Sequence, residues 1–274
     1  SRLRRRESAV SGRGASSAPA VAPSVVTGSA IARVEARLAA MARTTAVRLT
    51  GEDLTLADVW EVAVEHAGVE LDESAREKMA AARAVVEEAL RAEEPTYGVT
   101  TGFGRFVSTR VPGELAEELQ LRLLRSHACG VGEPYPEEIV RAAMLMRANA
   151  LAKGYSGTRV DVAELLLECL GRDVIPEVPS RGSVGASGDL APLAHLALPL
   201  VGEGRARVRG ELLSGADALA QAGLQPLRLQ AKEGLSLVNG TQFMGAFAAL
   251  GLVRATTLAK TADAACALSV DALQ

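Results

Sequence analysis

The feature that most limits the fold is a long alanine-rich segment that follows Asn239-Gly240-Thr241 and continues to the end of the sequence. Its residue types favour a helix, because alanine and leucine have the lowest cost of helix formation. Large apolar residues lie all around this helix; they are Met244, Phe247, Leu250, Val253, Leu258 and Leu268. A helix that is apolar on most sides must be surrounded by other helices. We therefore expect a mainly α protein, a bundle of long helices, which exposes a large apolar surface when this chain is alone.

The rest of the chain predicts more helices and a small N-terminal part that contains short strands. Alternating and helical periodicities predict, in chain order, strands at 47–49 and 69–71, helices at 55–68, 74–91, 114–128, 136–154, 158–170 and 189–200, and a hairpin at 205–213. Thr55 is a predicted helix cap, and Ser74-Ala75-Arg76-Glu77 is a predicted capping box. Arg209-Gly210 is the predicted turn of the hairpin.

Composition and charge argue against several classes of protein. A net charge of −3 over 274 residues gives no reason to expect binding to nucleic acid or to a membrane surface. Arg254, Lys260 and Asp263 interrupt the C-terminal apolar run, so we do not expect it to span a membrane. The cysteines, Cys129, Cys169 and Cys266, form no CxxC pair, which predicts a reduced, cytoplasmic protein without a metal site.

The first residues differ from the rest in composition. Residues 1–42 are basic and rich in Ser, Ala and Pro, and such a segment cannot bury enough apolar surface to order itself. Two interpretations are open: a transit peptide, or an upstream extension with Met41 as the true start. We favour the extension, because Met41 leads directly into the first patterned segment. The expected domains are then 1–42 as a disordered extension, 43–235 as an N-terminal domain, and 236–274 as the start of a helical bundle.

The stretch Gly182 to Leu193 carries unusual chemistry at its centre, where Ala186-Ser187-Gly188 places small residues in a row. Glycine tolerates the backbone conformations in which the Gly188 nitrogen approaches the Ala186 carbonyl carbon. Attack there, with loss of water, closes a five-membered ring, and loss of a second water from Ser187 leaves an exocyclic methylene. The product is an electrophile, which no ordinary side chain supplies. Alternatively, this stretch is a glycine-rich turn before a helix.

The run through His195 resembles the signature of the aromatic amino acid ammonia-lyases, and the match extends over contiguous residues. The resemblance implies a methylidene-imidazolone group that forms autocatalytically from Ala186-Ser187-Gly188, without metal or pyridoxal phosphate. Asp189 opens the next helix, so the group would lie at the positive end of that helix. Asp189 is a supporting residue that could orient the tripeptide, and it is also a simple N-cap candidate.

Two further segments match the same family. The glycine-rich loop from Thr96 to Gly104 carries Tyr97, which the resemblance implies is the base that removes a β-proton, with Gly104 in support. By itself, Tyr97 would be interpreted as a loop residue packed on a helix. In Leu237 to Gln242, the resemblance places Asn239 beside the electrophile or the substrate amine, with Gln242 in support. Asn239 is equally well placed to be the N-cap of the long helix.

The pair Ser126-His127, before Gly130, occupies the position that follows the substrate ring in this family. Ser-His resembles the histidine-specific members, and an imidazole can share a hydrogen bond with an imidazole substrate. A histidine near a helix end is also a common partner of the helix dipole. We interpret His66 and His195 as structural.

The resemblance covers about 46–274 and implies an ammonia-lyase that converts L-histidine to trans-urocanate in the cytoplasm, as a homotetramer with active sites shared between subunits. Family chains are nearly twice as long, and their second half carries further active-site residues. The alternatives are a phenylalanine or tyrosine ammonia-lyase or aminomutase, and a non-catalytic fragment that needs a partner half.

Overall fold

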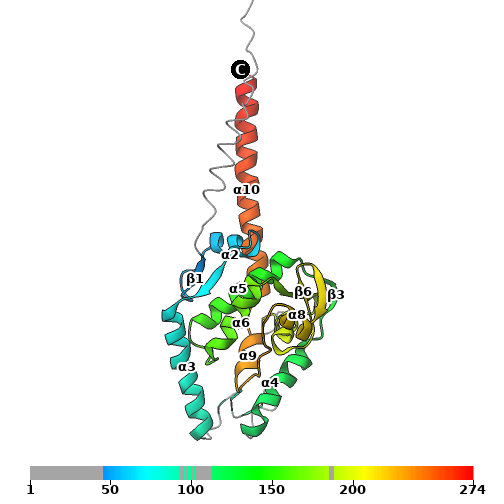
Figure 1. Ribbon diagram of the computed structural model, residues 1–274. Helices are drawn as coiled ribbons and strands as arrows, with labels where there is room; N and C mark the ends of the chain where they lie inside the picture. The colour runs from blue at the N-terminus through cyan, green and yellow to red at the C-terminus, as the bar shows by residue number, and fades with distance from the viewer. Residues whose placement is uncertain are drawn as a thin grey trace, which may run out of the picture. The chain divides into compact units, whose positions relative to one another are not determined.

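The computed structural model describes residues 46–92, 96, 98–99, 101–102, 113–184 and 188–273 (Figure 1). The elements in chain order are β1 (Val47–Leu49), α2 (Leu56–Ala63), β2 (Val69–Leu71), α3 (Glu73–Ala92), α4 (Gly113–His127), β3 (Val131–Pro134), α5 (Glu137–Ala152), α6 (Val160–Gly171), β4 (Val174–Pro176), β5 (Pro179–Arg181), α7 (Leu190–Ala197), the 3₁₀ helix η2 (Leu198–Val201), β6 (Arg205–Val208), β7 (Glu211–Ser214), α8 (Gly215–Gln221), α9 (Glu233–Val238) and α10 (Gln242–Ala272). The expectation of a mainly α protein with a few short strands is confirmed.

The core is built around α5, which packs against α2, α6 and α10. Its buried face combines small and large residues, namely Ala142, Ala143, Met144, Leu145, Ala148 and Leu151. The small alanines allow neighbouring helices to approach closely, and each large side chain removed from water contributes about 1.5–3 kcal/mol. Helix α5 therefore anchors α2, α6 and the first turns of α10.

The strands form small sheets that set the positions of loops. Strands β1 and β2 pair in parallel, and β4, β6 and β7 form an antiparallel sheet. The predicted hairpin turn is confirmed, because Arg209 and Gly210 have φ of 50° and 87°, as a two-residue turn of type I′ requires. Strand β3, which follows α4, pairs antiparallel with β5, which leads into the segment before Ala186. This pairing brings the end of α4 close to the start of the tripeptide loop.

Several predicted helix ends need correction. Thr55 caps α2 as predicted and shares a reciprocal capping box with Asp58, but the helix ends at Ala63 and not near Gly68. The left-handed φ of 57° at His66 does not continue a right-handed helix. Helix α3 begins at Glu73, one residue before its predicted start. The Asp72 carboxylate accepts hydrogen bonds from the backbone nitrogen and hydroxyl of Ser74, so Asp72 replaces Ser74 as the cap.

Helix α10 has two different halves. Phe243, Ala246, Ala249 and Leu250 are buried, whereas every described residue from 251 to 273 is at least partly exposed. Leu258 and Leu268 are 71% and 72% exposed, and in Figure 1 this half extends beyond the other described helices. Among the described residues, the helical stretch Glu233–Ala272 has the length and composition needed to cross a membrane, a test that core helices of soluble proteins also pass. The predicted exposed apolar surface is present on this chain.

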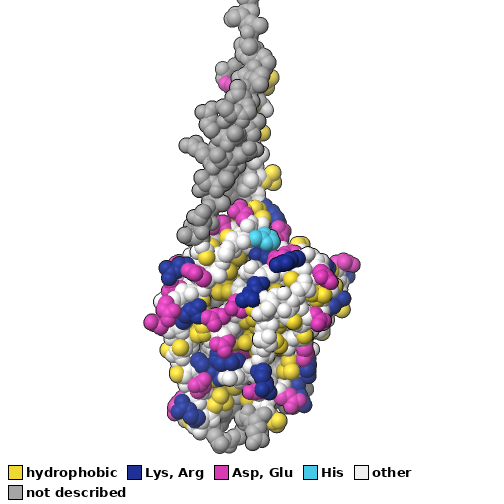
Figure 2. All heavy atoms as spheres, viewed as in Figure 1, with side chains coloured by type: hydrophobic (Ala, Val, Ile, Leu, Met, Phe, Trp, Pro, Cys, Tyr) yellow, Lys and Arg dark blue, Asp and Glu magenta, His cyan; other side chains and the backbone are white. Residues whose placement is uncertain are grey.

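Charged side chains of both signs are interspersed over the face of the molecule seen in Figure 2. Of the free cysteines, Cys169 is buried, and burial raises the pKa of its thiol to about 12. Such a thiol stays protonated and unreactive at neutral pH.

Candidate active site

The structure describes Ser126, His127, Gly188, Asp189, Asn239 and Gln242 among the predicted site residues. Tyr97, Gly104, Ala186 and Ser187 lie outside the described residues. Of the tripeptide, the structure describes Gly188, together with the segments that pack around it.

Gly188 is packed directly against Gly240. Gly188 has a φ of 85°, and a Cβ at this position would collide with the Gly240 carbonyl oxygen. The same oxygen accepts a hydrogen bond of 2.7 Å from the backbone nitrogen of Asp189. Only glycine meets both conditions, the left-handed backbone and the close approach. The last residue of the tripeptide thus lies beside Gly240, which follows Asn239.

The Asp189 carboxylate joins three parts of the chain. Asp189 is 1% exposed, its Oδ1 accepts a hydrogen bond of 3.1 Å from Ser183 Oγ, and its Oδ2 accepts one of 3.1 Å from the backbone nitrogen of Met244. Met244 lies in the first turn of α10, where backbone N–H groups have no partner within the helix. The Asp189 side chain makes no cap hydrogen bond to α7. Asp189 thus occupies the N-cap position of α7, as predicted, but its carboxylate caps α10 instead.

Asn239 is not the N-cap of the long helix α10. It is the C-cap of α9, and Thr241 occupies the N-cap position of α10 without a side-chain hydrogen bond. The Asp189 carboxylate provides this cap from another element. The Asn239 side chain is exposed, so it is available for a ligand.

Arg147, on α5, holds the turn from Asn239 to Gln242. Its Nη1 donates to the Asn239 carbonyl oxygen at 2.8 Å and to Gln242 Oε1 at 3.2 Å. Arg147 is 4% exposed, and burial lowers the pKa of its guanidinium to about 10. A Cβ on Gly240 would lie 2.7 Å from Arg147 Nη1, so a larger residue there would have to displace the guanidinium. The sequence analysis missed Arg147, whose only signal was an arginine inside an apolar helical pattern.

Ser126 and His127 form the last turn of α4. Ser126 Oγ donates to the Leu123 carbonyl oxygen at 2.9 Å, and His127 Nδ1 lies 2.9 Å from the same oxygen. A carbonyl only accepts, so this contact requires the proton on Nδ1, which leaves Nε2 of a neutral imidazole as an acceptor. His127 is half-buried and retains access to solvent.

His195 ties this helix end to α7. Its Nε2 accepts a hydrogen bond of 3.0 Å from the Gly130 backbone nitrogen, and burial lowers the pKa of the imidazole. Both observations favour the neutral ring. Helix α4 also packs against α7 and α9. Ser126-His127 at the end of α4, Asp189 before α7 and Asn239 after α9 therefore lie on adjacent elements.

Tyr135 is a second residue near the site that the sequence analysis did not identify. Its ring stacks on Phe243 and meets Phe247 edge to face, with ring centroids 5.4 and 5.3 Å apart. Burial and the negative charge of Asp189 raise the pKa of its phenol. Tyr135 therefore remains a neutral phenol at physiological pH.

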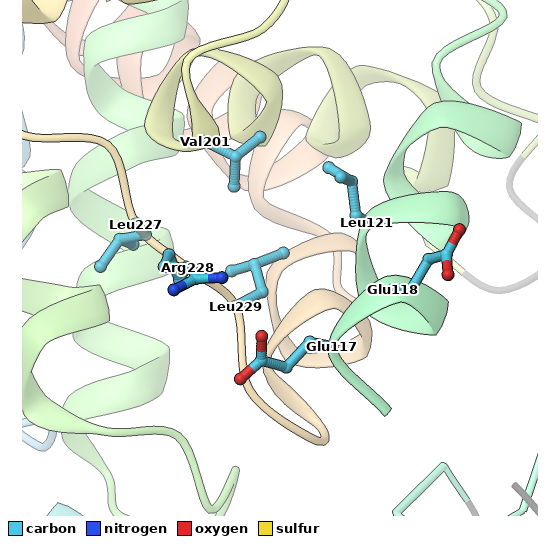
Figure 3. Close-up of a pocket in the computed structure, with 7 residues that line it drawn as sticks. All are labelled: Glu117, Glu118, Leu121, Val201, Leu227, Arg228 and Leu229. Atoms are coloured by element: carbon cyan, nitrogen blue, oxygen red, sulfur yellow. The ribbon is translucent and has the colours of Figure 1, made fainter. Parts of the chain in front are cut away.

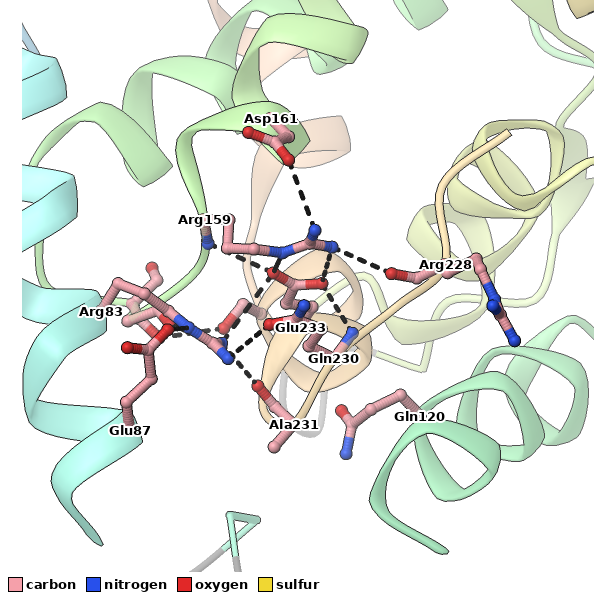
Figure 4. Close-up of polar contacts among 12 residues, drawn as sticks. Arg83, Glu87, Gln120, Arg159, Asp161, Arg228, Gln230, Ala231 and Glu233 are labelled. Atoms are coloured by element: carbon pink, nitrogen blue, oxygen red, sulfur yellow. Dashed lines mark hydrogen bonds and ion pairs between the residues drawn. The ribbon is translucent and has the colours of Figure 1, made fainter. Parts of the chain in front are cut away.

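A buried ion cluster supports the segment that leads into α9 (Figure 4). Glu233 is fully buried and accepts hydrogen bonds from Arg159 Nε at 2.8 Å and Nη2 at 2.9 Å. Arg83 Nη1 lies 3.9 Å from Glu233 and donates to the Ala231 carbonyl oxygen at 3.1 Å. The cluster fixes the start of α9, the helix whose C-cap is Asn239.

The cavity in Figure 3 lies elsewhere. Its volume is about 340 Å³, and its lining residues are Glu117, Glu118, Leu121, Val201, Leu227, Arg228 and Leu229, none of which is a predicted site residue. Within the described part of the chain, no group of three or more His, Cys, Asp or Glu side chains is placed to hold a metal ion.

Comparison with known proteins agrees with this arrangement. The aromatic amino acid lyase family matches residues 54–274. The chain is 54% identical over 224 residues to the histidine ammonia-lyase of Gloeobacter violaceus, covering 82% of this chain and 44% of that protein. It is similar to the crystal structure of histidine ammonia-lyase from Trypanosoma cruzi, at 38% identity and a TM-score of 0.75 over 80% of this chain and 42% of that chain. It also resembles tyrosine aminomutase from Streptomyces globisporus, at 39% identity and a TM-score of 0.73 over 77% of this chain and 40% of that chain.

The chain spans less than half the length of these relatives. The match nevertheless includes every described element from α2 through α10. The chain belongs to the aromatic amino acid lyase family.

Proposed function

We propose that this chain is the N-terminal part of a histidine ammonia-lyase, a carbon–nitrogen lyase of histidine catabolism that converts L-histidine to trans-urocanate and ammonia. The similarity to curated histidine ammonia-lyases supports an amino acid substrate. The observation that carries histidine in particular is His127, whose Nδ1 contact leaves Nε2 as an acceptor at the end of α4.

The residues around Gly188 fit a methylidene-imidazolone formed from Ala186-Ser187-Gly188. Cyclisation requires a residue without Cβ at position 188, and the Gly240 carbonyl oxygen occupies the space that a Cβ would fill. Asp189 and the Asn239 turn would hold the group in place. When present, the group supplies an electrophilic methylene, which converts the substrate amine into a leaving group.

The chain's own residues then bind the substrate and move its proton. His127 Nε2 accepts the N–H of the substrate imidazole, with Ser126 supporting the orientation of His127. Tyr97, on its glycine-rich loop with Gly104, acts as the base for the β-proton. The exposed Asn239 amide holds the ring oxygen or the substrate amine, and Gln242 supports the turn that carries Asn239.

We propose that the complete enzyme needs neither metal nor pyridoxal phosphate and that it is a cytoplasmic homotetramer with shared active sites. The exposed apolar half of α10 supports assembly, because an isolated helix with this surface would associate in water. We retain the proposed domains 1–42, 43–235 and 236–274, of which the last begins the helical bundle.

The test compares kcat/KM for L-histidine, L-phenylalanine and L-tyrosine in the full-length lyase that carries this sequence. Phenylalanine has no N–H to donate to His127 Nε2, so burying its ring there leaves that acceptor unpaired, and we expect a strong preference for histidine. Preference for phenylalanine or tyrosine would overturn the assignment.

The same assay, with its products identified, tests the alternatives. A β-amino acid product would indicate an aminomutase, the activity named for one structural relative. Replacing His127 with Leu should reduce kcat/KM for histidine by about 10- to 100-fold, the value of one lost hydrogen bond in a buried site. Residues 1–274 by themselves should associate and form no urocanate, whereas an active monomer would contradict the proposed architecture.

A further inference from the structure

We propose that Arg147 is a positioning residue for the elimination reaction: it holds the backbone of Asn239 so that the Asn239 amide faces the substrate. This inference rests on the proposed function. Arg147 belongs to α5, far from the tripeptide in sequence, and it touches the site through the Asn239 turn.

The first argument is geometric. The turn from Asn239 to Gln242 is held from two sides: Arg147 Nη1 binds the Asn239 carbonyl and the Gln242 amide oxygen, while the Asp189 backbone nitrogen binds the Gly240 carbonyl. The contact through Asp189 fixes the turn against the tripeptide. The contact through Arg147 fixes it against α5, the central helix of the core.

The second argument is the cost of placing Arg147 where it is. Arg147 is 4% exposed and forms no ion pair with a carboxylate in the described part of the chain, and its Nε has no hydrogen-bond partner there. A buried cation without a counter-ion is destabilising. An apolar residue of similar size would fill the space on α5 without this cost. What a guanidinium adds is a planar, rigidly held Nη1 whose two N–H groups donate to two acceptors of one turn.

Arg141 provides a matched comparison on the same helix. It is 2% exposed, donates to the Val62 carbonyl oxygen at 3.2 and 3.3 Å, and pairs with Asp173 at 2.9 Å. Its contacts hold the end of α2 and include no predicted site residue. Arg141 and Arg147 therefore share helix, residue type and burial, and differ in what they hold.

The experiment uses the full-length, active lyase and compares Arg147→Lys with Arg141→Lys. Lysine keeps the charge, but its flexible stem lacks the planar guanidinium that fixes Nη1 between the two acceptors. We expect both variants to lower the melting temperature by similar amounts. Only Arg147→Lys should lower kcat in folded protein, by roughly 10- to 100-fold, the effect of misplacing a catalytic group by about 1 Å. Intact mass should show the same loss of two waters in the wild type and in both variants.

A double-mutant cycle separates positioning from a general structural role. If Arg147 acts through Asn239, adding Arg147→Lys to Asn239→Ala should lower kcat no further, whereas adding it to His127→Leu should multiply the two losses. Gln242→Met removes one acceptor of Arg147 from a half-buried position, so it repeats the test without altering the core; we expect a smaller loss with the same dependence on Asn239.

Three outcomes would overturn the inference: equal kcat in Arg147→Lys and Arg141→Lys, multiplicative losses with Asn239→Ala, or an Arg147→Lys protein that has not lost the two waters. If Arg147→Lys fails to fold, Gln242→Met takes its place: a kcat equal to that of the wild type, or a loss that multiplies with that of Asn239→Ala, would overturn the inference. A wild-type enzyme that makes no urocanate would instead refute the proposed function, and this inference with it.

Discussion

Two buried charge arrangements in this protein differ in what they stabilise. Glu233 is fully buried with Arg159 at 2.8 Å and Arg83 at 3.9 Å, so positive and negative charges meet. Arg147 is nearly as buried, but its described partners are the oxygens of a backbone carbonyl and an amide. The first arrangement holds elements of the fold together, from α3 to α9. The second holds one turn beside the tripeptide.

The difference teaches that burial of charge by itself does not locate a site. In the Glu233 cluster, each charge compensates another, and removing one partner leaves the others stranded. At Arg147 the uncompensated charge remains, next to the exposed amide of Asn239 and close to Gly188, which cannot accept a Cβ. The predictions below test whether the fold and the chemistry can be disrupted separately.

The largest expected effect is on chemistry without loss of fold. Ser187→Ala removes the source of the exocyclic methylene, so activity should fall on the order of 10³-fold or more, as when a covalent catalytic group is removed. The melting temperature should stay near that of the wild type. Kinetics and intact mass of the full-length enzyme provide the check, and normal activity in the variant would refute the electrophile.

At the ion cluster around Glu233 we expect a loss of stability. Glu233→Gln leaves Arg83 and Arg159 without their buried carboxylate, so the free energy of unfolding should fall by about 3–5 kcal/mol. Denaturant unfolding measures this loss. Asp161→Asn is the matched control, because Asp161 pairs with Arg159 from a position 61% exposed and should change stability by only about 0–1 kcal/mol. Equal losses would mean that the cluster does not hold the fold.

A smaller effect is expected from His195 on the pH dependence of stability. Burial lowers the pKa of His195 below its ordinary value of 6.5, and the neutral ring accepts the Gly130 hydrogen bond. The unfolded state therefore takes up a proton first as pH falls, so stability should be full above about pH 6.5 and decline below it. Melting temperatures from pH 8 to 5 should show this slope in the wild type and a weaker one in His195→Gln. An identical slope in both proteins would exclude His195 as the source.

The smallest effect is expected from deleting residues 1–40, which lie outside the described residues. Their basic, Ser- and Pro-rich composition predicts no contribution to the core. The melting temperature and activity of the full-length enzyme should be unchanged within error. A loss of several degrees would show that these residues pack on the rest of the protein.

Local signals in the sequence determined most of the elements. Thr55 with Asp58 caps α2, Arg209-Gly210 turns the hairpin, and the small-residue run with its matching segments identifies the family. Such features depend on residues that are close together in the chain, because caps and turns form within a few residues. Helix ends were less well predicted. Asp72 replaces Ser74 as the cap of α3, and α2 ends at Ala63 and not near Gly68.

The tertiary structure alone decided how the site is held. Asp189 caps α10 at Met244, which is 55 residues further along the chain, and Arg147 reaches Asn239 across 92 residues. No local pattern encodes these contacts, because each polar group binds whichever partner the packing of helices brings within about 3 Å. The sequence determined which residues have the right chemistry. The packing of α5, α7 and α10 determined which of them meet, since burial requires each polar group to find a partner in the folded protein.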